Sequence, residues 1–260
     1  MDLHLRGKRA LVTGASQGIG EGIAKTLASE GVDLVLTARS ADNLDRVRGE
    51  IAGISGVAVE ILPLDVTEAG ACERLAAETG DIDILVNNAG VIPGGDLFDI
   101  DEDRWRAGWE LKVFGYINLC RQIYPKLKAR GGGVIVNIIG NAGEALDPQY
   151  ICGSTGNASL MAFTRTLGGN SLADNVRVVG INPGPVNTDR IYSLLKKLAK
   201  TRFGDENRYT ELEAMYPLGR PAHVGEIADL VAFLASDRSG YTSGTIFTVD
   251  GGIASRRSIV

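Results

Sequence analysis

The sequence predicts an α/β protein built on one doubly wound parallel sheet of about seven strands, with helices on both faces. The first observation is that short runs rich in Val, Ile and Leu alternate along the chain with segments of helical period. The second is that these runs are almost continuously apolar, which is typical of strands buried on both faces. The third is a length of 260 residues without a repeat or a linker, which suits one domain over residues 1–260.

The order of the expected elements is strand, then helix, throughout. The expected strands are residues 8–13, 32–38, 57–64, 82–87, 133–139, 176–182 and 245–250. The expected helices are residues 18–30, 41–52, 68–79, 101–129, 154–170, 190–200 and 223–236. Such alternation gives right-handed crossovers, and sheets of this kind bind ligands at the carboxyl ends of their strands. We therefore look for function directly after each strand.

A glycine-rich turn follows the first expected strand and opens a helix. Residues 13–20 read TGASQGIG. Glycines let the backbone turn sharply and approach a pyrophosphate, while the helix N-terminus supplies free N–H groups and a positive dipole end. In this strand–turn–helix context the pattern predicts a dinucleotide site. The expected binding residues here are Gly14, Ser16, Gln17, Gly18, Ile19 and Gly20.

Four further short segments follow the expected third, fourth and sixth strands or lie near the end of the chain. They are Asp65-Val66, residues 87–90 (NNAG), residues 182–184 (NPG) and residues 249–252 (VDGG). Together with the TGxxxGxG spacing, they resemble the short-chain dehydrogenase/reductase family over nearly the whole chain. The resemblance implies a Rossmann-type fold, a small-molecule substrate and a homodimer or homotetramer. It also implies that the cofactor contacts Asp65, Val66, Asn88, Ala89, Gly90, Asn157, Pro183, Gly184, Val186 and Thr188.

The end of the second expected strand bears on the choice of cofactor. NAD-specific Rossmann proteins usually place an acid here, which bonds the ribose hydroxyls and repels a 2′-phosphate. This chain has Ala38 instead, followed by Arg39, which can pair with a phosphate. We therefore expect NADP(H) to be preferred over NAD(H), although the neutral Gln17 makes the preference modest. The alternative is that Arg39 is a solvated surface charge.

The catalytic positions depart from the resemblance. The family's active site consists of Asn, Ser, Tyr and Lys, and the helix around residue 157 aligns with its Tyr-x-x-x-Lys helix without a gap. That alignment puts Gly153 in the tyrosine position, Asn157 in the lysine position, Gly140 in the serine position and Lys112 in the asparagine position. All four usual residues are therefore replaced.

The replacements suggest a rebuilt site. An ammonium and an amide are exchanged between the positions of Lys112 and Asn157. Tyr150, Gly153 and Asn157 share one face of a helix that begins by residue 150, so the phenol can reach toward the space at Gly153. The expected catalytic residues are therefore Lys112, Tyr150 and Asn157, with Lys112 or Tyr150 as proton donor. The alternative is that Tyr150 is a pocket wall and Lys112 a surface lysine.

Loop and lid residues are further candidates. Asn141 and Glu144 follow the fifth expected strand and can line the pocket. Residues 188–220 form the segment where the family builds its substrate lid. This segment has an apolar stripe at Ile191, Leu194, Leu195 and Leu198, and basic residues at Lys196, Lys197, Lys200 and Arg202. It is either a basic lid over an anionic substrate or a solvated helix face.

Charge and composition exclude several functions. The net charge is −5 with both signs spread along the chain, so we expect no nucleic-acid or membrane partner. The three cysteines are scattered, which is typical of reduced thiols in a cytoplasmic protein, and we expect no metal site.

The sequence therefore predicts an NADP(H)-dependent oxidoreductase that acts on an unknown carbonyl or alcohol with an atypical proton donor. Two alternatives stay open. One is an NADP(H)-binding protein without redox turnover, such as a sensor or a structural subunit. The other is a non-redox lyase or isomerase on the same scaffold, because a fold alone does not determine function.

Overall fold

One parallel sheet of seven strands runs through the molecule. The structure is a computed structural model and describes residues 1–256. The strand order is β3-β2-β1-β4-β5-β6-β7, and every neighbouring pair is parallel. The strands are β1 (Arg9–Thr13), β2 (Asp33–Ala38), β3 (Val59–Pro63), β4 (Ile84–Asn87), β5 (Gly133–Ile138), β6 (Val176–Pro183) and β7 (Thr245–Val249). The predicted doubly wound sheet is confirmed.

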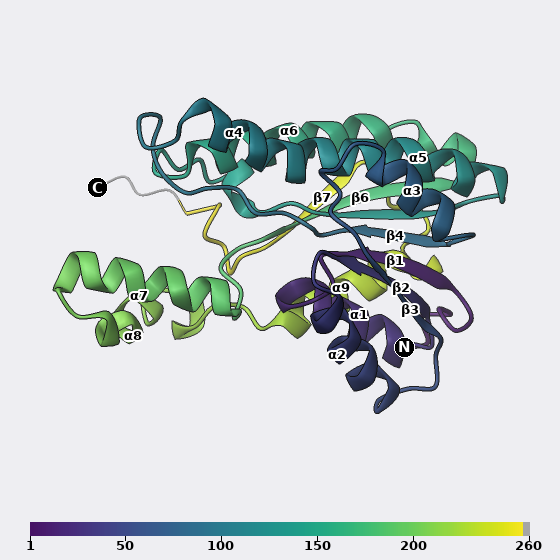
Figure 1. Cartoon of the computed structure of the whole chain (residues 1–260), viewed down its shortest axis with the longest axis horizontal. Coiled ribbons are helices and arrows are strands. Elements are labelled where there is room, and N and C mark those ends of the chain that lie inside the picture. The colour runs from purple at the N-terminus through teal and green to yellow at the C-terminus, as the bar shows by residue number, and fades with distance from the viewer. Residues whose placement is uncertain (257–260) are drawn as a thin grey trace.

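Helices cover both faces of this sheet. Figure 1 shows α3 to α6 above the sheet and α1, α2 and α9 below it, with α7 and α8 set to one side. The helices are α1 (Gly18–Ser29), α2 (Ala41–Ala52), α3 (Ala71–Glu78), α4 (Glu102–Trp109), α5 (Gly115–Ala129), α6 (Ile151–Gly168), α7 (Asp189–Phe203), α8 (Tyr209–Glu213) and α9 (Val224–Ala235). Short 3₁₀ turns lie between several of them.

The apolar strands are buried because helices pack on both of their faces. Successive side chains of β1 belong to opposite layers: Val12 packs with the layer of α1 and α9, and Leu11 with the layer of α3 and α5. The segment of α7 and α8 has a small apolar cluster of its own, centred on Leu195, Ala199 and Leu212. This segment is therefore packed largely against itself and not into the two main layers.

The largest difference from the expected elements lies in the segment 101–129. One long helix was expected, but α4 and α5 are separated by a π-helical segment, Glu110–Phe114. A π segment holds one extra residue per turn and is frequent at functional sites. The short helix α8 was not expected either, and α6 begins three residues before the expected residue 154.

None of the helices formed by residues 1–256 combines the length and the apolar character that crossing a membrane requires.

Candidate active site

A cleft of about 650 Å³ opens at the carboxyl ends of the strands. It is lined by the turns that follow β1, β2, β3, β4, β5 and β6, together with the π segment and the start of α7. We refer to its two ends by the elements that form them. The β2–α2 end contains Arg39, Ser40 and Asn43, and the β5–α6 end contains Lys112, Gly140, Tyr150, Asn157 and Arg190.

The cleft brings together almost all of the residues singled out from the sequence. Lys112 and Tyr150 line it. So do Gly14, Ser16, Gln17, Gly18, Ile19, Arg39, Asp65, Val66, Asn88, Ala89, Gly90, Asn157, Pro183, Gly184, Val186 and Thr188. Gly20 is the exception, since it lies beneath the turn. A Cβ atom there would come within 2.3 Å of the Gly14 carbonyl oxygen, so Gly20 serves close packing of helix and turn.

Hydrogen bonds tie the glycine turn to the end of β4. The side-chain amide of Asn88 donates to the carbonyl oxygens of Thr13 and Gly14, at 3.0 and 3.2 Å. The Thr13 hydroxyl accepts from the backbone N–H of Asn88 and of Ala89, at 2.9 and 3.0 Å. These contacts satisfy polar groups where two strands end and fix the turn before any ligand binds.

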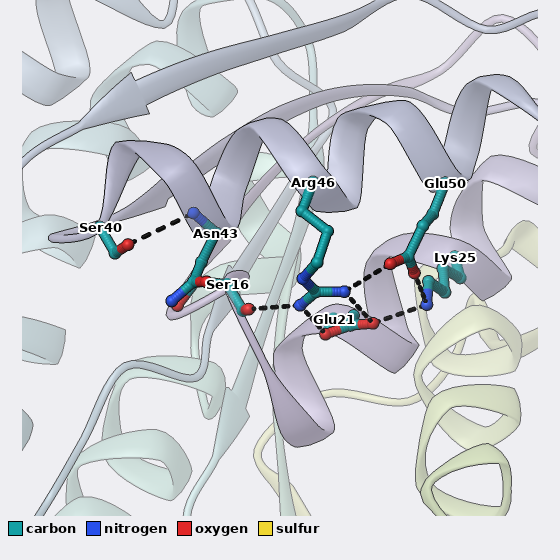
Figure 2. Close-up of polar contacts among 7 residues, drawn as sticks. All are labelled: Ser16, Glu21, Lys25, Ser40, Asn43, Arg46 and Glu50. Atoms are coloured by element: carbon teal, nitrogen blue, oxygen red, sulfur yellow. Dashed lines mark hydrogen bonds and ion pairs between the residues drawn. The ribbon is translucent and has the colours of Figure 1, made fainter.

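A second set of contacts holds the other side of this turn to α2. Figure 2 shows Arg46 between α1 and α2, where its guanidinium donates to the Ser16 carbonyl oxygen at 3.1 Å. The same guanidinium pairs with Glu21 at 2.8 Å and with Glu50 at 2.6 Å. Lys25 joins both glutamates and completes the network. Sequence reasoning missed Arg46, and its i,i+4 spacing from Glu50 was the available signal.

The β2–α2 end presents one exposed arginine to the cleft. Arg39 follows β2 directly, and Ser40 caps α2 by accepting from the backbone N–H of Asn43. Within residues 1–256 no acidic side chain forms an ion pair with Arg39, whereas Arg46 and Arg48 are paired. The end therefore offers an unneutralised guanidinium beside a hydroxyl and an amide, which suits an anion.

At the β5–α6 end, the π segment directs Lys112 into the cleft. Its ammonium donates to the carbonyl oxygen of Ile139, and its aliphatic stem passes over Gly90. Burial, reinforced by the positive charge of Arg190, lowers the pKa of Lys112 to about 7. The side chain does not face bulk water. At neutral pH it can hold or release a proton.

Tyr150 occupies the space that a side chain at residue 153 would fill. A Cβ atom on Gly153 would lie 2.0 Å from two carbons of the Tyr150 ring. The helix α6 begins one residue later, at Ile151, so the ring lies across the first turn toward Gly153. Burial raises the pKa of the Tyr150 hydroxyl, and the adjacent Arg190 guanidinium partly counteracts this. The phenol is therefore protonated at neutral pH and available as a hydrogen-bond donor.

Asn157 lies beside Gly140 with one polar atom unpaired. A Cβ atom on Gly140 would come within 2.9 Å of the Asn157 amide nitrogen, and Gly140 has a φ of +133°, a region that favours glycine. Asn157 is 3% exposed, and its side-chain oxygen has no hydrogen-bond partner among residues 1–256. A buried unpaired acceptor is costly, so a hydrogen-bond donor on a ligand that reached this oxygen would stabilise it.

Some neighbouring residues differ from expectation. Asn141 lines the cleft and donates to Asp250, but Glu144 instead accepts from the Thr248 hydroxyl at 2.7 Å. None of the basic residues proposed for the lid lines the cleft, namely Lys196, Lys197, Lys200 and Arg202. Arg190 lines it instead, and sequence reasoning missed this residue. Its position two residues after Thr188, in the first turn of a helix, was the available signal.

Comparisons with known proteins agree with this geometry. Residues 14–254 match the family model described as enoyl-(acyl carrier protein) reductase. The chain is 35% identical to the oxidoreductase UcpA of Escherichia coli O157:H7, over 95% of both chains. The structure superimposes on L-sorbose reductase from Gluconobacter frateurii with a TM-score of 0.90 and 33% identity, over 99% of this chain and 100% of that one. That structure contains NADPH and L-sorbose.

A solved short-chain dehydrogenase/reductase family protein is similar to the same extent. It has a TM-score of 0.84 and 34% identity, over 98% of this chain and 100% of that chain. The matches extend over the glycine turn, the strand ends and α7, which are the parts that form the cleft. The chain therefore belongs to the short-chain dehydrogenase/reductase family of oxidoreductases.

Proposed function

We propose that the protein is an NADP(H)-dependent oxidoreductase that interconverts a carbonyl compound and an alcohol. The observation that carries this proposal is the Tyr150 ring, which fills the space of a residue-153 side chain. Residue 153 aligns with the family's catalytic tyrosine. Tyr150 would thus supply a phenol beside the position of that tyrosine, although it comes from three residues earlier in the chain.

The cleft fits a dinucleotide on two structural grounds. A Cβ atom on Gly18 would lie only 3.3 Å from the Thr188 side chain, so the glycine keeps the space between the turn and Thr188 free. The unpaired side-chain oxygen of Asn157 lacks a donor that a ribose hydroxyl would supply. Gly14 to Ile19 would hold the pyrophosphate, and Asn157 the sugar next to the nicotinamide. When bound, the reduced nicotinamide supplies a hydride to the carbonyl carbon.

Residues of this chain would donate the proton to the substrate and stabilise the charge that develops on it. We propose that the Tyr150 hydroxyl donates to the substrate oxygen, because burial keeps it protonated. Lys112 would supply positive charge that stabilises the oxygen as negative charge develops on it. Its pKa of about 7 allows it to exchange a proton within the working range.

The preference for NADP(H) rests on Arg39. Solved relatives contain different cofactors, since the L-sorbose reductase structure contains NADPH and a 7α-hydroxysteroid dehydrogenase structure contains NADH. The family alone does not decide the cofactor. The unpaired Arg39 guanidinium, with Ser40 and Asn43 beside it, supports binding of a 2′-phosphate.

A screen for carbonyl-dependent NADPH oxidation, with identification of the alcohol formed, tests the proposal. We expect stoichiometric oxidation with at least one class of carbonyl. Tight NADPH binding without oxidation by any carbonyl would favour the cofactor-binding protein, and cofactor-independent turnover would favour the lyase or isomerase.

By family resemblance we also propose a homodimer or homotetramer, with residues 188–220 acting as a lid over the substrate. Light scattering of the purified protein tests the assembly, and a monomer at micromolar concentration would contradict it.

A further inference from the structure

The proposed function assigns no role to Arg190, which also lines the cleft. It lies in the first turn of α7 and lines the β5–α6 end together with Lys112 and Tyr150. Its guanidinium lies next to the Tyr150 hydroxyl. Two cationic side chains and a phenol therefore converge where the substrate would bind.

The charge of Arg190 is not balanced by the protein. Within residues 1–256, no carboxylate forms an ion pair with it, whereas Arg208 and Arg220 of the same segment pair with Glu211 and Glu226 at 2.6 and 2.9 Å. The acids that line the cleft are Asp65 and Asp189. Asp65 follows β3 and bonds Thr67, and Asp189 precedes Arg190 at the start of α7. Arg190 is exposed, so its unpaired guanidinium is accessible to an anionic ligand at the β5–α6 end.

We propose that the substrate is a 2-oxo acid, whose carboxylate binds Arg190 while its ketone oxygen faces Tyr150. The inference rests on the proposed function. Arg190 and Tyr150 line the same end of the cleft, and a 2-oxo acid has its ketone and carboxylate on neighbouring carbons, so one small ligand can reach both side chains. A planar guanidinium matches a carboxylate with two parallel hydrogen bonds.

The reaction balances with the groups already named. The ketone carbon takes the hydride that the nicotinamide supplies, and the ketone oxygen takes a proton from the Tyr150 hydroxyl. The product is a 2-hydroxy acid, the cofactor leaves oxidised, and the phenol regains its proton from solvent. The carboxylate is unchanged throughout.

Apolar residues that line the cleft indicate the chemical character of the substituent on the 2-oxo acid. Val91, Ile191 and Leu194 also line the cleft, and Val91 and Leu194 are 58% and 48% exposed. Exposed apolar side chains at a cleft edge favour an apolar group on the ligand. We therefore expect an aliphatic or aromatic 2-oxo acid in preference to a sugar acid.

The first test compares an aliphatic 2-oxo acid with its methyl ester, which differs only in charge. For the wild type we expect the acid to have a kcat/KM at least about ten-fold higher, the scale of one charge-assisted contact. Arg190→Met should remove that advantage, because kcat/KM should fall at least about ten-fold more for the acid than for the ester. Arg202→Met, a lid arginine that stacks on Phe203 outside the cleft lining, is the matched control and should keep it. Equal loss for acid and ester would mean that Arg190 acts on Tyr150, and would overturn the inference.

The second test does not depend on turnover. Oxamate, an unreactive 2-oxo acid analogue, is titrated by calorimetry into protein loaded with NADPH. We expect saturable binding, at least about ten-fold weaker binding of methyl oxamate, and a similar loss in Arg190→Met. Equal binding of oxamate and its ester, equal competition by inorganic phosphate, or weaker NADPH binding in Arg190→Met would each overturn the inference. If no carbonyl is reduced but oxamate binds as expected, the proposed function fails and the carboxylate site stands.

Discussion

Two glycines decide which side chains occupy the β5–α6 end of the cleft. Gly153 leaves the space that the Tyr150 ring fills, and Gly140 leaves room for the Asn157 amide nitrogen, which would lie 2.9 Å from a Cβ atom on residue 140. Close-packed interiors leave little spare volume, so a side chain at either position would displace its neighbour. We therefore propose that the replacements at these positions compensate for one another.

Gly153→Ala tests this compensation. Its methyl group would lie 2.0 Å from the Tyr150 ring, so the ring must move from its present position. We expect reductase activity to fall about as far as in Tyr150→Phe, with NADPH affinity little changed. Gly49→Ala is the control, because it also adds a methyl group within a helix but meets no atom within 4 Å. Unchanged activity in Gly153→Ala would show that the ring has no catalytic role.

Lys112 predicts a pH dependence. Its pKa of about 7 lies below the ordinary lysine value, so the ammonium loses its proton as the pH rises through 7. The rate of carbonyl reduction should therefore fall above about pH 7. Lys112→Met should abolish this fall in rate above pH 7 and lower turnover by ~10²-fold, the usual scale for an acid/base group. Lys197→Met, outside the cleft lining, should retain the wild-type profile. If the rate of Lys112→Met still falls above about pH 7, another group is responsible for the pH dependence.

At the scale of elements, the turn that would bind the cofactor is held from both sides. Asn88 fixes it to β4, and Arg46 fixes it to α2 through the Ser16 carbonyl oxygen. The sequence predicted the turn because glycine spacing is a local signal. It did not predict Arg46, because that contact joins residues thirty positions apart. The π segment was missed for a different reason, because its pattern of apolar residues resembles that of an ordinary helix.

Arg46→Met should weaken NADPH binding by about ten-fold or more. The loss of a charge-assisted hydrogen bond costs roughly 1.5–3 kcal/mol and leaves Glu21 and Glu50 without this cation. Arg48→Met is the control, because Arg48 pairs with Asp45 and makes no contact with the turn. NADPH fluorescence titration measures both. Equal affinities in the two variants would mean that the turn keeps its shape without Arg46.

At the scale of the whole molecule, the strand order decides which turns meet. The parallel sheet brings the ends of β1, β2, β4, β5 and β6 to one edge, so alternating apolar runs and glycine spacing were enough to predict the fold and most of the cleft. The direction of individual side chains was beyond that reasoning. Arg190 was missed and Glu144 was misplaced, because their directions depend on how the first turn of α7 and the loop after β5 pack, and not on where a strand ends.

The two ends of the cleft are expected to contribute separately, one to cofactor preference and the other to turnover. Arg39 lies at the β2–α2 end, remote from Tyr150 at the β5–α6 end. Arg39→Ala should therefore raise the Kd for NADPH about ten-fold or more, leave the Kd for NADH nearly unchanged, and preserve turnover at saturating cofactor. Titration with both cofactors measures this. Equal affinities of the wild type for NADPH and NADH would refute the preference.

We propose that Tyr150 takes the place of the family's tyrosine in a working reductase. The test is to measure the rates of alcohol formation and of NADPH oxidation together, in the wild type and in Tyr150→Phe under saturating cofactor. Tyr124→Phe is the control, because that phenol bonds Asp174 away from the cleft. We expect one alcohol per NADPH in the wild type, a rate lower by ~10²-fold or more in Tyr150→Phe and an unchanged rate in Tyr124→Phe. Full activity in Tyr150→Phe would contradict it.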